Sequence, residues 1–160
     1  MPYIEADDAD DRLGEICLSS ELTAWTALDD GDKEILISRA VEKLESLSFR
    51  GSKYDMDQEE LFPRYDQYGY YDYTEEDGCH IPQAILDAIC LEAVAIVASS
   101  GGSYAQIDTL QEHGVKSVRI SGTGLQYEFT GSPSATRGGF VSERAWKLIS
   151  RYLARDVMTI

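Results

Sequence analysis

Residues 81–97 read Ile-Pro-Gln-Ala-Ile-Leu-Asp-Ala-Ile-Cys-Leu-Glu-Ala-Val-Ala-Ile-Val. Apolar residues fall on almost every side of the 3.6-residue helical period, which is the pattern of a buried helix. Pro82 fits the first helical turn, where its missing N–H group costs nothing. The small side chains of this segment allow neighbouring elements to approach closely. We therefore expect it to form the central helix of the fold.

Two short motifs precede this helix and are expected to shape the chain around it. Phe49-Arg50-Gly51 contains a glycine at a natural helix stop. In Leu61-Phe62-Pro63-Arg64 the proline pushes Phe62 toward extended backbone, so that Leu61 and Phe62 can anchor in the core. The structural motif positions of this region are Phe49, Gly51, Phe62, Pro63, Arg64 and Pro82.

The N-terminal part of the chain predicts further helical segments. Residues 5–17 are acid-rich and favour a short helix, because acidic side chains stabilise a helix N-terminus. Ser20 is the expected N-cap of a short turn that carries Trp25. Capping candidates at 29–32 then lead into apolar side chains at helical spacing, which predict a half-buried helix ending near Phe49.

The pattern changes after residue 115. Apolar and polar residues alternate from Val118 to Phe129 around a Ser-Gly-Thr-Gly turn, which predicts a β-hairpin at about 115–129. A segment rich in glycine and serine follows, and then a helix at about 141–156.

The expected fold class is therefore mainly α, a helical bundle of four to five helices with one small β-hairpin. We expect a helical domain at 1–130, a flexible linker at 131–140, and a C-terminal helix and tail at 141–160.

Charge is large and unevenly spread along this chain of 160 residues, whose formal net charge is −15. Residues 1–34 hold eleven acidic side chains against Arg12 and Lys33, and residues 54–77 hold nine against Arg64. Residues 131–160 carry five basic side chains against two acidic ones. An acidic surface repels phosphate, so wrapping nucleic acid is not expected to be the main task. The basic end could dock on an acidic partner or on an acidic neighbouring subunit.

No pattern of an enzyme or a metal site is present in the sequence. His80 and His113 lack partners at metal-ligand spacing. Cys17, Cys79 and Cys90 match neither a zinc pattern nor a disulfide framework, which favours reduced thiols. The chain is therefore expected to have no catalytic residues, no metal and no cofactor. No apolar run approaches the ~20 residues of a membrane span, and the acidic N-terminus does not resemble a signal peptide.

A cluster of tyrosines between the two proline motifs is the most distinctive candidate contact. Tyrosine buries a large area at small entropic cost, so a loop that contacts a protein is credible. A base-stacking platform is the alternative, but the neighbouring acids would repel a nucleic-acid backbone. An insertion loop without function is also possible. The cluster consists of Tyr65, Tyr68, Tyr70, Tyr71 and Tyr73.

These motifs in this order resemble the head–tail connector (adaptor, head-completion) proteins of tailed bacteriophages, near a group labelled DnaT-like single-stranded-DNA-binding. The resemblance covers most of residues 3–130 and continues to Arg151-Tyr152-Leu153. The long acidic tyrosine loop departs from the pattern. The residues that carry the resemblance also include Trp25, Asp32-Lys33 and Gly114-Val115-Lys116-Ser117.

The resemblance implies a structural virion protein that forms a ring under the portal, typically of twelve copies. Such a ring extends the DNA channel and docks the tail or stopper, with DNA only as passing cargo. It implies a location at the capsid vertex of the virion after assembly in the host bacterial cytoplasm. The alternative is an accessory protein of replication that binds single-stranded DNA. The implied portal contacts are Arg144, Trp146, Arg151, Tyr152, Leu153 and Arg155.

Overall fold

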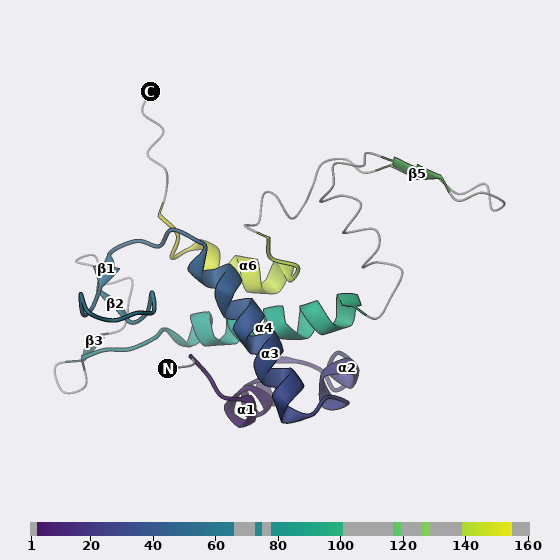
Figure 1. Ribbon diagram of the computed structural model, residues 1–160, viewed down its shortest axis with the longest axis horizontal. Helices are drawn as coiled ribbons and strands as arrows, with labels where there is room; N and C mark the ends of the chain where they lie inside the picture. Colours follow the sequence, from purple (N-terminus) through teal and green to yellow (C-terminus); the bar gives the residue numbers. More distant parts are fainter. Residues whose placement is uncertain are drawn as a thin grey trace.

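The computed structural model describes residues 3–65, 73–74, 78–100, 117–119, 126–128 and 139–154 (Figure 1). These residues are mainly helical with small antiparallel β elements, as the sequence predicts. The helices in this part of the chain are α1 (Ala6–Ile16), α2 (Thr23–Thr26), α3 (Asp30–Glu45), α4 (Gln83–Ser100) and α6 (Glu143–Ser150).

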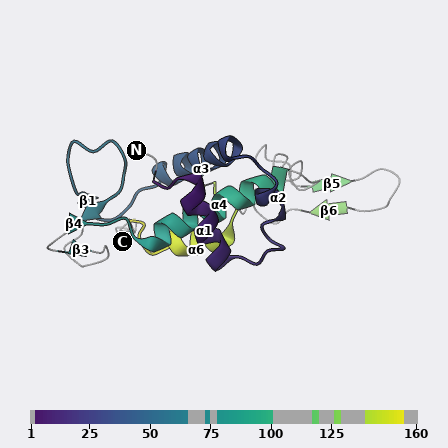
Figure 2. The same ribbon diagram turned by 90° about the horizontal axis from the view of Figure 1, so that it is seen from below.

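Helix α4 lies at the centre of the bundle, which confirms the prediction for residues 81–97. Helices α1, α2, α3 and α6 all pack against it, and Figure 2 shows α6 lying along it. Ile85, Ala88, Ile89 and Ala93 of α4 are almost completely buried. Burying a side chain such as Ile89 stabilises the fold by about 1.5–3 kcal/mol, so α4 supplies much of the hydrophobic core.

Helix α3 begins as the sequence predicts and ends earlier. The Asp29 side chain accepts a hydrogen bond from the Asp32 backbone N–H at 2.9 Å, which makes it the N-cap. The helix ends at Glu45, four residues before Phe49. The next residues leave the helix to pair with the end of the described chain, so the break precedes the glycine.

The start of α2 corrects the predicted cap. Leu22, not Ser20, occupies the N-cap position, and no side chain caps the helix there. Ser20 instead offers its carbonyl oxygen to the Thr23 hydroxyl at 3.2 Å. Trp25 is 1% exposed, and its indole N–H donates to the Asp10 carboxylate at 2.7 Å.

Three pairs of short antiparallel strands occur among the described residues. β5 (Ser117–Arg119) pairs with β6 (Gln126–Glu128), which confirms the predicted hairpin. β1 (Ser52–Lys53) pairs with β2 (Arg64–Tyr65), and β3 (Tyr73–Thr74) with β4 (Gly78–Cys79). The last two pairs lie where the sequence predicts only a loop. Strands of two residues are too short to carry a period-2 pattern.

The C-terminal helix is shorter than expected and packs on its own domain. α6 ends at Ser150, and Leu153 forms an isolated β-bridge with Phe49. Phe140 falls inside the predicted linker but is 1% exposed, so the chain is anchored in the core before α6 begins. The remainder of that linker, residues 131–138, lies outside the described residues.

Candidate interaction surfaces

Five of the six motif residues meet in one junction, formed by residues 48–51, 61–64 and 152–154, whereas Pro82 directly precedes α4. The buried Arg64 guanidinium donates hydrogen bonds to the carbonyl oxygens of Phe49, Arg50, Gly51 and Leu61, at 2.6–3.4 Å. The Phe49 and Phe62 rings meet edge to face with centroids 4.9 Å apart. Both motifs therefore serve one structural purpose, which is to fix the chain after α3.

The same junction holds the end of the described chain. The Arg50 side chain donates to the Leu153 carbonyl at 2.9 Å, and its backbone N–H donates to the Tyr152 carbonyl at 2.9 Å. The Ala154 N–H donates to the Ser48 carbonyl at 2.9 Å. The strand-like segment after α6 is thereby tied to the segment after α3.

Gly51 has a backbone φ of 71°. This left-handed conformation is costly for residues with a Cβ atom. Gly51 therefore allows the turn from α3 into β1, which is a more specific role than ending the helix.

Tyr3 joins the N-terminus to this junction. Its hydroxyl accepts hydrogen bonds from the backbone N–H groups of Leu61 and Phe62 at 3.0 and 3.3 Å, and donates to Glu45 at 3.0 Å. Burial raises the pKa of the Tyr3 hydroxyl well above its ordinary value. The group therefore stays protonated and able to donate.

Glu92 is a buried carboxylate that sequence reasoning missed. It is fully buried in α4 and accepts a hydrogen bond from the Lys43 ammonium at 2.8 Å. It also accepts from the backbone N–H groups of Val141 and Ser142, each at 2.9 Å. The carboxylate thus links α3, α4 and the start of α6. An acid on a helix that is apolar nearly all round is the signal that could have predicted such a site.

The implied portal contacts are divided between the core and the surface. Tyr152 and Leu153 belong to the junction, and the half-buried Trp146 packs against Phe140 with ring centroids 6.1 Å apart. Arg144 is exposed and donates to the Ile16 carbonyl at 2.7 Å. Arg151 is exposed with its guanidinium 4.9 Å from the Tyr152 ring centroid. Arg155 lies outside the described residues.

Only part of the tyrosine cluster lies among the described residues. Tyr65 lies in β2 and is 49% exposed. Tyr73 lies in β3, where only the backbone is described. Tyr68, Tyr70 and Tyr71 lie outside the described residues.

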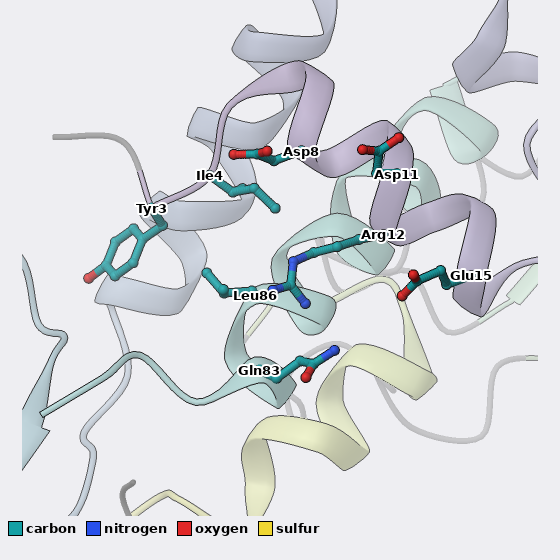
Figure 3. A pocket seen from close by; sticks show the side chains of 8 residues that line it. All are labelled: Tyr3, Ile4, Asp8, Asp11, Arg12, Glu15, Gln83 and Leu86. Atoms are coloured by element: carbon teal, nitrogen blue, oxygen red, sulfur yellow. The ribbon is translucent and has the colours of Figure 1, made fainter. Parts of the chain in front are cut away.

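A groove of about 400 Å³ lies between α1 and the start of α4 (Figure 3). Asp8, Asp11 and Glu15 of α1 border it. Arg12 points from α1 toward Gln83 and Leu86 of α4, and its guanidinium pairs with Asp87 at 2.9 Å. The groove therefore offers carboxylates at its border and suits a basic group better than a phosphate.

Reactive and metal-binding groups are few in the described part of the chain. No group of three His, Cys, Asp or Glu side chains there could hold a metal ion, and no helix there is long and apolar enough to cross a membrane. Cys17 and Cys90 are free thiols. Cys90 is fully buried in the core, and burial raises the pKa of its thiol to about 12. A thiol with so high a pKa is a poor nucleophile at neutral pH.

A family model described as "Putative DnaT-like ssDNA binding protein" matches residues 3–155. No curated protein and no solved structure matches the chain. The description supports the single-stranded-DNA alternative more directly than the connector, about which the match says nothing. Because it runs over almost the whole chain, the chain belongs to this DnaT-like family.

Proposed function

We propose that this chain is a head–tail connector protein of a tailed bacteriophage, which works by protein contact as a ring under the portal. It extends the DNA channel there and docks the tail or stopper. The observation that carries the proposal is the acidic character of a mainly helical chain with a formal net charge of −15. The ordered motif series that resembles the connectors adds to it.

The charges of the described surface favour protein over nucleic acid as the bound partner. Proteins that bind DNA replace its counterions with lysine and arginine side chains. Here the chain has 29 acidic against 14 basic side chains, and α1 exposes Asp7, Asp8, Asp11 and Glu15. A channel wall of this character would repel phosphate, so packaged DNA would slide past it.

The second candidate is a replication accessory protein that binds single-stranded DNA, which the family description favours. Its strand would need cationic and aromatic side chains side by side. Among the described residues, α6 offers the nearest approach to this, with exposed Arg144, Lys147 and Arg151 and the half-buried Trp146.

Two binding assays on one preparation separate the candidates. The connector predicts extra density on the isolated portal protein of the same phage when the chain is added, seen by negative-stain imaging. It also predicts no change in the anisotropy of a labelled oligothymidylate at low salt. Density identical with and without the chain would contradict the connector.

The single-strand candidate predicts the converse. The anisotropy would rise with protein concentration, and the apparent affinity would fall steeply as salt is added. Lys147→Glu with Arg151→Glu should then weaken binding at least about tenfold, since two phosphate contacts would become repulsive. Unchanged oligonucleotide binding by this variant would exclude α6 as the contact.

A further inference from the structure

The segment between β1 and β2 exposes an apolar tip among acids. We define residues 53–60 as the acidic loop, and Figure 2 shows this part of the chain standing off at one end of the molecule. Met56 is 95% exposed and Tyr54 is 51% exposed. Asp55, Asp57 and Glu59 are exposed around them. An apolar tip with an acidic border fits a surface of opposite charge that has an apolar centre.

Hydrogen bonds within the acidic loop hold its shape. The Lys53 ammonium donates to the carbonyl oxygens of Gln58 and Glu59 at 2.8 and 2.9 Å. The Gln58 amide donates to the carbonyls of Glu60 and Pro63 and accepts from the Asp55 N–H at 3.0 Å. A loop ordered before contact loses less conformational entropy on binding.

The complementary surface lies on α6. Arg144, Lys147, Leu148 and Arg151 follow the spacing i, i+3, i+4 and i+7 and therefore share one side of the helix. We call these four residues the outer face of α6. Its three basic side chains are exposed around the half-buried Leu148.

The ion pairs on this face are open to replacement. Lys147 pairs with Glu143 at 2.9 Å, and their side chains are 72% and 57% exposed. Arg144 lies 3.6 Å from Glu21, and these side chains are 53% and 46% exposed. Ion pairs that are so exposed contribute little to stability. The carboxylates of a partner can therefore compete for the same basic side chains.

We propose that the acidic loop of one copy docks on the outer face of α6 of a second copy. Met56 then covers the exposed part of Leu148, while Asp57 and Glu59 face Lys147 and Arg151. The two surfaces differ, so the contact is head to tail and each copy keeps one surface for the next neighbour. This inference rests on the proposed connector function and specifies the contact between neighbouring copies.

Sedimentation velocity of the purified chain tests the contact. In low salt we expect the average mass to rise with protein concentration up to about 1 mM. Added salt should weaken the contact, because exposed charges are screened beyond about 10 Å at 0.1 M. High salt should return the chain to a monomer. A wild-type chain that stays monomeric in low salt at every concentration overturns the proposal.

Charge reversal makes the test specific. Asp57→Lys with Glu59→Lys, and separately Lys147→Glu with Arg151→Glu, should each weaken self-association at least about tenfold, because attraction becomes repulsion. An equimolar mixture of these two variants should associate again. The control is Glu34→Lys with Glu42→Lys on exposed positions of α3, which changes the net charge by the same amount as Asp57→Lys with Glu59→Lys and should associate at least as strongly as wild type.

Two results contradict the contact: variants that associate like wild type, and a mixture that fails to regain association. Portal binding is measured on the same proteins. A wild-type chain that self-associates with this charge dependence but ignores the portal supports the contact and contradicts the connector function alone.

Discussion

The helical core around α4 and the junction at residues 48–51, 61–64 and 152–154 hold together in different ways. In the core, side chains such as Ile85 and Ile89 exclude water from every side. In the junction, one guanidinium satisfies four backbone carbonyl oxygens. Apolar burial is spread over many side chains, whereas the junction depends on a few polar groups with fixed partners.

Glu92 combines both kinds of contact, because it lies in the apolar helix α4 yet accepts hydrogen bonds from the backbone just before α6. Glu92→Ala should therefore have the largest effect, about 3–5 kcal/mol of unfolding free energy, as expected when one partner of a buried pair is removed. The N–H groups of Val141 and Ser142 would lose their acceptor.

Urea unfolding measures this loss, and hydrogen exchange locates it. Faster exchange in α6 than in α1 would show that the carboxylate ties α6 to the bundle. Glu92→Gln keeps an acceptor oxygen and should lose less unfolding free energy than Glu92→Ala. A Glu92→Ala variant as stable as wild type would contradict the stabilising role of the Glu92 carboxylate.

Ile89→Ala is the matching change in the apolar region, at a side chain that is 1% exposed. It should lower the unfolding free energy by about 3 kcal/mol, because it leaves a cavity in a packed core. Ile35→Ala in α3 is the control, since Ile35 is 53% exposed. Chemical denaturation should separate the two variants clearly, and equal losses would contradict the placement of Ile89.

Arg64→Ala should cost about 2–3 kcal/mol, because several carbonyl oxygens lose a charged donor. Arg64→Lys keeps the charge without the planar fork and should recover only part of this loss. Thermal unfolding of both variants is the measurement. Full recovery by lysine would mean that the charge matters in the junction and the donor geometry does not.

This comparison also explains what the sequence could predict. The period of residues 81–97 identified α4, and the capping candidates at 29–32 included the N-cap Asp29, because both signals are local. Arg64 and Glu92 were not assigned their partners, because most of those partners are backbone groups at least 13 residues away in the sequence. The same limit applies to the implied portal residues, since the buried Tyr152 meets Arg50, through a backbone hydrogen bond, only after folding.

Glycines test the junction on a smaller scale. Gly51→Ala should destabilise the protein by about 1–2 kcal/mol, because φ at this position is 71°. Gly14→Ala lies inside α1, and outside the adjacent helix backbone no atom lies within 4 Å of the added Cβ, so it should stabilise by about 0.5–1 kcal/mol. Opposite shifts in melting temperature are expected. Shifts of the same sign would contradict the strained turn.

The smallest effect is expected at Asp10, which joins α1 to α2 and α3 as the junction joins its own segments. Burial raises the pKa of this carboxyl, but hydrogen bonds from Lys33 at 2.6 Å and from Trp25 outweigh burial and lower the pKa overall. A lowered pKa in the folded state means that the stabilisation is present at neutral pH. It is lost as pH falls below about 4 and through the folded-state pKa.

Asp10→Asn should therefore cost less than about 1 kcal/mol at pH 7, since the Asp10 side chain is 42% exposed and solvent screens the pair. Unfolding free energies at pH 7 and pH 3 measure the difference between variant and wild type. That difference should shrink at pH 3, because the Asp10 carboxyl of the unfolded chain is then largely protonated. A difference that grows on acidification would reverse the sign of the linkage and contradict the role of the Lys33 and Trp25 contacts.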